Sequence, residues 1–218
     1  MVMDDVNILK YKGLDYGLGL TEVELDLFRV YLDELLFWNQ RMNLTGLSAR
    51  KEIINELFLD SIIPVPVLPE KGRMLDIGSG AGLPGIPLKI CLPSLKTHLV
   101  EPTSKRVSFL KQIIRLLRLK NIEVIDERIE RAGDRLDPDG YDVIVSRAVA
   151  EPAQIIEWCA SLLVPEGLLV CFLGKDAEEI LEKLQHEMDA FFLKLFNKIL
   201  YVLPGKDTSR TIIVLQKS

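Results

Sequence analysis

The stretch DIGSGAGLPG, from Asp76 to Gly85, decides the fold that this sequence predicts. It follows a strand-like apolar run at residues 73–77 and precedes a helix-like segment at residues 86–91. Glycines at such a bend let the backbone turn sharply and approach a ligand without a Cβ clash. In open α/β sheets, ligands bind at the carboxyl ends of the strands. The stretch therefore predicts a nucleotide-like cofactor after the first strand of a parallel sheet.

Two cofactors compete for this loop. Gly80, Gly82 and Gly85 satisfy the GxGxxG spacing of dinucleotide enzymes. However, Gly78 already follows the strand, so the register favours the spacing DxGxGxG. A carboxylate at the strand end, here Asp76, suits the ammonium group of S-adenosylmethionine, whereas it would repel a pyrophosphate. The charge argument favours S-adenosylmethionine over NAD.

A second acidic residue, Glu101, ends the next strand-like run, 25 positions after Asp76. An acidic side chain there can accept hydrogen bonds from both ribose hydroxyls of an adenosyl cofactor, and NAD enzymes use the same device. The alternative is that Glu101 caps the helix expected to begin near Ser104. We expect the ligand role.

Outward from the loop, short apolar runs alternate with helix-like segments, which is the βα order of a doubly wound sheet. The strands are expected at residues 73–77, 97–101, 122–125, 141–145 and 168–173, and the helices at 86–91, 104–117, 153–163 and 176–188. Two final runs, residues 192–202 and 211–215, are joined by the turn-like pair Pro204-Gly205 and predict an antiparallel edge pair.

The N-terminal part is expected to be helical. Thr21 followed by Glu24 is the capping-box signature of a helix start, and a second helical pattern begins near Ser48 and ends at a cluster of prolines, residues 64–69. We expect residues 1–70 to form a helical extension and residues 71–218 the α/β core, together as one compact unit.

Composition limits the class of protein. A hydrophobic content of 48% with 27% charged residues is typical of a soluble globular chain. No apolar run reaches the 18 residues that a membrane span needs, and the first residues lack the features of a signal peptide, so we expect a cytoplasmic protein.

Three scattered cysteines and two isolated histidines predict no metal site. The oligomeric state stays open, with a monomer as the default.

The net charge of -5 argues against a protein that coats nucleic acid indiscriminately. Residues 105–120, in contrast, carry six basic side chains and no acidic one. Lys111, Arg115 and Arg118 fall on one face of the helix expected there. This face is either an RNA contact or an ordinary solvated surface.

Several motifs in order resemble the glucose-inhibited division protein B family, whose members are guanine-N7 methyltransferases of 16S ribosomal RNA in the small ribosomal subunit. The resemblance covers nearly the whole chain. Its motifs are WNQRMNLT from Trp38, FLDS from Phe58, DIGSGAGLPGIPL from Asp76, KRVSFL from Lys105, RIE from Arg128 and SRAVA from Ser146.

The resemblance implies a Rossmann-like class I methyltransferase with a seven-stranded, mostly parallel sheet, an antiparallel edge and an N-terminal helical cap. It implies S-adenosyl-L-methionine as cofactor, lying across the glycine loop. The binding positions it carries over are Gly78, Leu83, the pair Ile129-Glu130 and Arg147. Further functional arginines correspond to Arg128 and Arg210, which we expect to hold RNA phosphates or orient the base.

Two positions depart from the family's pattern. Leu57 stands where the family usually has a histidine, and Leu173 stands where it usually has a lysine. Neither belongs to the cofactor set, so the departures bear on substrate binding.

The chemistry implied by the resemblance needs no general base. Guanine N7 has an unprotonated lone pair, which can displace the methyl group in line if donor and acceptor are well positioned. The sequence lacks the Asn/Asp-Pro-Pro-aromatic segment used for exocyclic amines and the Pro-Cys nucleophile used for pyrimidine C5. Three alternatives stay open: a small-molecule methyltransferase on the same fold, an NAD-dependent oxidoreductase, and a binding protein without activity.

Overall fold

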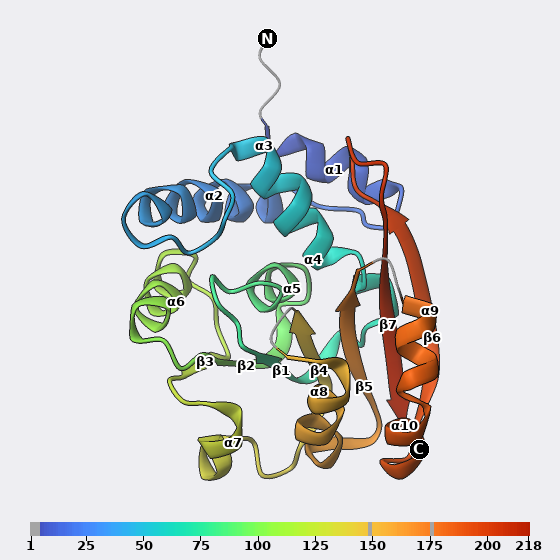
Figure 1. Cartoon of the computed structure of the whole chain (residues 1–218). Coiled ribbons are helices and arrows are strands. Elements are labelled where there is room, and N and C mark those ends of the chain that lie inside the picture. Colours follow the sequence, from blue (N-terminus) through green and yellow to red (C-terminus); the bar gives the residue numbers. More distant parts are fainter. Residues whose placement is uncertain (1–4, 148–149, 175–176) are drawn as a thin grey trace.

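The computed structural model describes residues 5–147, 150–174 and 177–218. Its centre is one seven-stranded sheet in the order β3-β2-β1-β4-β5-β7-β6 (Figure 1). The strands are β1 (Lys71–Ile77), β2 (Ser94–Val100), β3 (Ile122–Ile125), β4 (Tyr141–Arg147), β5 (Leu163–Leu173), β6 (Leu193–Val202) and β7 (Ser209–Lys217). Every expected strand is present.

Strands β1 to β5 pair in parallel, and β7 pairs antiparallel with both β5 and β6. This confirms the predicted class I fold with an antiparallel edge. Because the parallel strands run the same way, their carboxyl ends lie along one border of the sheet, across the strands. We call this border the carboxyl edge, as distinct from the antiparallel edge that β6 and β7 form. The opposite edge is the amino edge.

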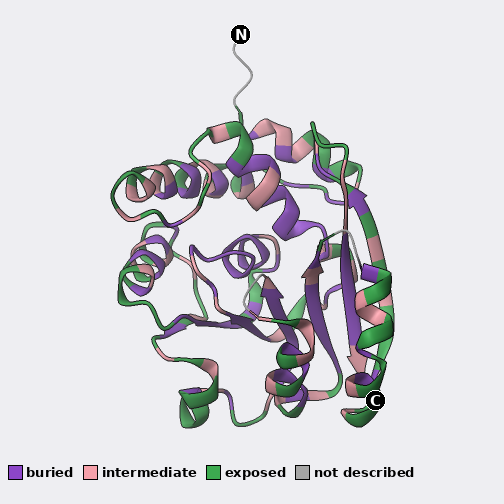
Figure 2. Ribbon diagram, in the orientation of Figure 1, coloured by how far each residue is buried: buried purple, intermediate pink, exposed green. Residues whose placement is uncertain are grey.

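Alternate residues of the strands enter two separate cores, as the period of two in a strand requires. One core lies beneath the N-terminal helices and helices α5 (Gly85–Cys91) and α6 (Ser104–Leu116), and it contains Met74, Val143 and Val145. The other core lies beneath helices α8 (Pro152–Cys159) to α10 (Gln185–Ala190), and it contains Leu75 and Ile144. Figure 2 shows the strands between these layers as buried, which explains why they read as continuous apolar runs.

The helices of the α/β core follow the predicted order. They are α5 (Gly85–Cys91), α6 (Ser104–Leu116), α7 (Ile129–Ala132), α8 (Pro152–Cys159), α9 (Ala177–Lys183) and α10 (Gln185–Ala190). The single helix expected at residues 176–188 is two helices that meet at Leu184, and its first residue lies outside the described part of the chain. Helix α8 ends earlier than expected, in a short 3₁₀ turn (Ala160–Leu162).

The N-terminal helices begin with α1 (Asn7–Leu14) and α2 (Glu22–Met42). The predicted capping box is confirmed at the start of α2, where the backbone N–H of Glu24 donates to Thr21 Oγ1 and Thr21 N–H donates to the Glu24 carboxylate. Helix α1 was not predicted, because it buries only Leu9 and Gly13 of its own residues and its apolar pattern is weak.

The second predicted helix is continuous but not uniform. It runs from α3 (Arg50–Ile53) through a π-helical turn (Ile54–Leu59) into α4 (Asp60–Ile62), and a 3₁₀ turn (Val65–Val67) follows within the proline cluster. Figure 1 shows α4 beyond the arrowheads of β4 and β5, so this helix covers the carboxyl edge.

One hydrophobic core joins the N-terminal helices to the sheet. Tyr31 of α2 stacks on Phe58 with ring centroids 4.8 Å apart, and it also stacks on Phe109 of α6 at 6.3 Å. The division at residue 70 stays a prediction. None of the helices in the described ranges is long and apolar enough to cross a membrane.

Candidate functional site

The glycine loop lies at the carboxyl edge, directly after β1. Gly78 N–H donates to Val100 O of the neighbouring strand at 2.9 Å. The φ angles of Gly78, Gly80 and Gly82 are 67°, 57° and 87°, in the left-handed region that favours glycine. Because Gly78 is the first residue after the strand, the predicted DxGxGxG register is confirmed.

Neighbouring atoms also leave no room for a side chain at two glycines of this loop. A Cβ on Gly85 would lie 2.5 Å from Asp76 Oδ2, and one on Gly82 would lie 2.4 Å from Ile86 Cδ1. The hydroxyl of Tyr31 donates a hydrogen bond to Ala81 O, so helix α2 also holds the loop. Leu83 is buried where the loop turns into α5.

Asp76 is fully buried beneath the loop. Its Oδ2 accepts a hydrogen bond from Gly85 N–H at 3.0 Å, at the start of α5. Its Oδ1 is buried and has no partner within the described residues. Burial raises the pKa of this carboxyl to about 7, although the nearby Ser79 hydroxyl, the Gly85 N–H and Arg147 favour its ionised form. A buried acceptor without a donor fits a ligand that brings an N–H, such as the ammonium group of S-adenosylmethionine.

Glu101 combines the two interpretations that the sequence left open. Its Oε2 accepts from Gly80 N–H at 2.9 Å, and its Oε1 accepts from the N–H of Thr103, directly before α6, at 2.8 Å. The carboxylate therefore shapes the glycine loop and caps the next helix. Each oxygen keeps a second lone pair, and the ribose role stays a prediction.

Arg147 is the last residue of β4 and lies beside the loop. Ser146 pairs with Ile77, so Arg147 is level with Gly78 across the two strands. Its side chain points to the same face of the sheet as Val145, toward the N-terminal helices. Its Nη1 lies 3.3 Å from Asp60 Oδ2. The rest of the SRAVA motif includes Ala148 and Val149, which lie outside the described residues.

Asp60 is a functional candidate that sequence reasoning missed. It lies inside a continuous helix, and its side chain is only 4% exposed. Its Oδ1 accepts from Arg210 Nη1 at 3.0 Å and from Tyr201 Oη at 2.7 Å. Burial and this carboxylate raise the pKa of Tyr201, so its hydroxyl stays a donor. The Asp60 carboxylate thus contacts both Arg147 and Arg210, two predicted site residues, and holds their guanidinium groups close together.

These side chains line a cleft of about 460 Å³ at the carboxyl edge, which we call the substrate cleft. Glu56, one helical turn before Asp60, adds a second carboxylate to the cleft. Its Oε2 lies 3.4 Å from Arg210 Nη2, and its Oε1 lies 2.8 Å from Lys206 Nζ. The substrate cleft is lined by Leu47, Glu56, Leu57, Asp60, Arg147, Phe172, Leu173, Gly174, Tyr201 and Arg210. Both departures from the family's pattern, Leu57 and Leu173, are therefore part of it.

The remaining predicted residues lie further along the carboxyl edge. Arg128 precedes α7, and Ile129 and Glu130 form the first turn of α7, beyond the end of β3. Strand β3 is three strands from β4, or roughly 14 Å at the usual spacing. Arg128 makes no ion pair with Glu130 in the described structure and is not brought to the substrate cleft.

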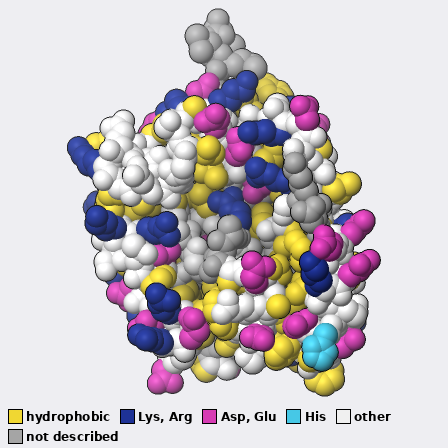
Figure 3. All heavy atoms as spheres, viewed as in Figure 1, with side chains coloured by type: hydrophobic (Ala, Val, Ile, Leu, Met, Phe, Trp, Pro, Cys, Tyr) yellow, Lys and Arg dark blue, Asp and Glu magenta, His cyan; other side chains and the backbone are white. Residues whose placement is uncertain are grey.

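The predicted basic face of α6 is present in part: Lys111 and Arg115 lie on the helix and are exposed. Arg118 is exposed too, but it follows the end of α6 with a φ of 54°, so it does not continue the helix face. Phe109 and Ile113 are buried on the opposite side, whereas Leu116 is 42% exposed. In Figure 3, basic and acidic side chains are interspersed on the visible face, with Lys and Arg on the side where α6 lies.

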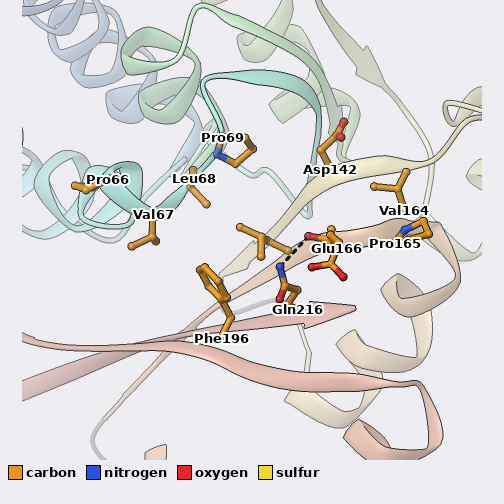
Figure 4. A pocket seen from close by; sticks show the side chains of 12 residues that line it. Pro66, Val67, Leu68, Pro69, Asp142, Val164, Pro165, Glu166, Phe196 and Gln216 are labelled. Carbon is orange, nitrogen blue, oxygen red and sulfur yellow. Dashed lines mark hydrogen bonds between the residues drawn. The ribbon is translucent and has the colours of Figure 1, made fainter. Parts of the chain in front are cut away.

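A second hollow, of about 370 Å³, lies at the amino edge, and we call it the amino-edge pocket (Figure 4). Prolines and other apolar side chains surround it, including Phe196. Two of its polar side chains are bonded to the chain itself: Asp142 accepts from Arg73 N–H at 2.7 Å, and Gln216 donates to Glu166 O at 3.3 Å.

Comparisons with known proteins show the family of this chain. The family model of GidB, rRNA small subunit methyltransferase G, matches residues 24–205. Ribosomal RNA small subunit methyltransferase G of Lachnoclostridium phytofermentans is 36% identical over 92% of this chain and 84% of its own length. The protein of the same name from Bacillus subtilis is 33% identical over 92% of this chain and 85% of its own length.

Solved structures show the same fold. The fibrillarin/Nop5p complex matches with a TM-score of 0.59 and 15% identity, over 74% of this chain and 82% of that chain. M. jannaschii TYW2, solved in complex with AdoMet, matches with a TM-score of 0.56 and 17% identity, over 69% of each chain. With its glycine loop, its unsatisfied buried carboxylate and these relatives, the chain belongs to the rRNA small subunit methyltransferase G family and is an S-adenosylmethionine-dependent methyltransferase.

Proposed function

We propose that this protein transfers the methyl group of S-adenosyl-L-methionine to N7 of a guanosine in 16S ribosomal RNA of the small ribosomal subunit. The relatives' names support a ribosomal RNA substrate, and the resemblance to the guanine-N7 family supports the acceptor atom. A cytoplasmic location follows from this substrate.

The observation that carries the proposal is the position of the substrate cleft. Arg147 lines the cleft and is level with Gly78 of the glycine loop. A base held in the cleft would therefore lie beside a cofactor held by the loop, which is the arrangement that direct methyl transfer requires.

The bound cofactor supplies an electrophilic methyl group. In our proposal, the loop glycines leave room for it, Asp76 accepts from its ammonium group, and Glu101 with the Ile129-Glu130 turn holds its adenosine end. Arg147 and Arg210 donate hydrogen bonds to guanine O6 or to a flanking phosphate, and these contacts orient N7. Because the N7 lone pair is unprotonated, no side chain has to remove a proton, and positioning provides the catalysis.

RNA binding outside the cleft would use the exposed side of α6 that carries Lys111 and Arg115, together with Arg118 just beyond the helix end. Arg128, beside α7, would hold a phosphate at the cofactor end of the carboxyl edge. Such contacts give affinity that falls as salt rises, and they carry no sequence information.

The test is transfer from methyl-labelled S-adenosylmethionine to small ribosomal subunits, free 16S RNA or metabolite mixtures, followed by mapping of the modified nucleotide. We expect label in ribosomal RNA at one guanine, sensitive to the strand cleavage that follows N7 methylation. Labelling of small metabolites alone would contradict the proposal. Label at a ring position other than N7 would contradict the acceptor atom only.

A further inference from the structure

Beside the substrate cleft lies a second concavity of about 520 Å³, formed where helix α2 ends and the chain turns toward α3. We call it the amide pocket. Its polar lining consists of Asn39, Gln40, Asn43, Thr45 and Ser48, and no charged side chain takes part. Leu47 lines both this pocket and the substrate cleft, so the two are adjacent.

Two of the amide-pocket residues are used by the fold. Asn39 Oδ1 accepts from Thr45 N–H at 2.8 Å, and Asn39 Nδ2 donates to Leu47 O at 2.8 Å. Asn43 ends α2 with a φ of 46°, a left-handed conformation that asparagine tolerates better than most residues. Asn39 and Asn43 therefore shape the wall of the pocket.

Gln40 and Ser48, in contrast, are exposed, and within the described residues their side chains make no hydrogen bond to the protein. An amide and a hydroxyl each donate and accept hydrogen bonds. This pairing suits the edge of a nucleobase, which also presents donors and acceptors. Without a basic side chain in the lining, the pocket does not suit a phosphate.

We infer that the amide pocket binds the base of a nucleotide that flanks the target guanosine. This inference rests on the proposed function. The nucleotides joined to a target base in the substrate cleft must lie near it, and the amide pocket, separated from the cleft by Leu47, is adjacent. Proteins that read single-stranded RNA hydrogen-bond the edges of such splayed bases.

The test measures methylation kinetics of Gln40→Ala and Ser48→Ala with small ribosomal subunits over a range of salt concentrations. We expect kcat/KM to fall about 10-fold for Gln40→Ala and less for Ser48→Ala, by the same factor at every salt concentration. A base contact releases no counterions, whereas a lost phosphate contact would flatten the salt dependence. Gln185→Ala on α10, an exposed glutamine far from the pocket, is the matched control and should leave kcat/KM unchanged.

A second measurement uses subunits reconstituted with RNA in which each base flanking the target is changed. For the wild type, one change should lower kcat/KM, and Gln40→Ala should make the enzyme indifferent to that same change. An unchanged kcat/KM in both variants, a flattened salt dependence, or a loss of cofactor affinity would overturn the inference. Failure of the wild type to methylate ribosomal guanine would instead overturn the proposed function.

Discussion

The two edges of the sheet carry hollows of similar size and opposite character. At the amino edge, Asp142 and Gln216 are bonded to the chain itself, and prolines and aliphatic side chains close the pocket. At the carboxyl edge, Asp76 keeps a buried oxygen without a partner, and charged side chains converge on Asp60. The size of a hollow thus says little about function. Ligands are expected at the edge that has a buried polar atom without a partner and several charged side chains close together.

The largest expected difference between the edges is in stability. Asp60→Ala leaves Arg147 without its carboxylate, Tyr201 without its acceptor and Arg210 with Glu56 alone, so we expect the free energy of unfolding to fall by about 3–5 kcal/mol. Asp142→Ala at the amino edge removes a partly exposed acceptor and should cost about 1 kcal/mol. Urea unfolding of both variants measures the contrast, and equal losses would contradict it.

The next contrast is in catalysis. Arg147→Ala should lower kcat/KM about 100-fold, or about 2.7 kcal/mol, because a positioned donor beside the methyl donor is lost. Its melting temperature should change little, since Asp60 keeps Arg210 and Tyr201 as partners. Arg73→Ala, the same substitution at the amino edge, removes contacts to Asp137 and Asp139 and should leave kcat/KM within about twofold. A large loss of stability in Arg147→Ala with normal activity would assign Arg147 a structural role.

The smallest contrast is in pH dependence. With a pKa of about 7 in the unliganded protein, Asp76 is mostly protonated at pH 6 and must lose its proton to pair with an ammonium group. Cofactor affinity should therefore fall about 10-fold from pH 7.5 to pH 6, and proton release should accompany binding. Asp76→Asn should abolish this dependence and bind weakly at every pH.

The matched control is Asp137 near the amino edge, where the Lys96 ammonium lowers the pKa of the carboxyl. Asp137→Asn should leave the pH profile of cofactor binding as in the wild type. Calorimetry in buffers of different ionisation heat measures both affinity and proton release. A flat wild-type profile would remove Asp76 from the role we assign to it.

Local signals made most of the fold predictable. Apolar runs of residues predicted the strands. The DxGxGxG spacing predicted the glycine loop, because a side chain at these glycines would strain the backbone or clash with neighbouring atoms. The alternation of side chains along a strand also predicts that Arg147 lies on the same face of the sheet as Val145. The register that places Asp76 on that face, and the covering of this face by the N-terminal helices, are seen only in the structure.

The partner of Arg147 was not predictable in the same way. Asp60 and Arg147 are 87 positions apart, and their contact depends on how the N-terminal helices cover the sheet. The FLDS motif marked Asp60 without revealing its role. Helix α1 was missed for a related reason, since a short helix with few buried residues leaves little periodicity in the sequence.

The π-helical turn at residues 54–59 has a consequence for comparing relatives and for redesign. A π turn holds one more residue than an α turn, and each residue of an α-helix advances the side-chain direction by about 100°. Deleting one residue from the π turn would therefore convert it to an α turn and leave Asp60 directed toward the two guanidinium groups it joins, whereas a deletion in a regular α turn beside it would rotate Asp60 by about 100°. Alignments with relatives that are one residue shorter here should therefore place the gap within residues 54–59, so that Asp60 stays assigned to the cleft.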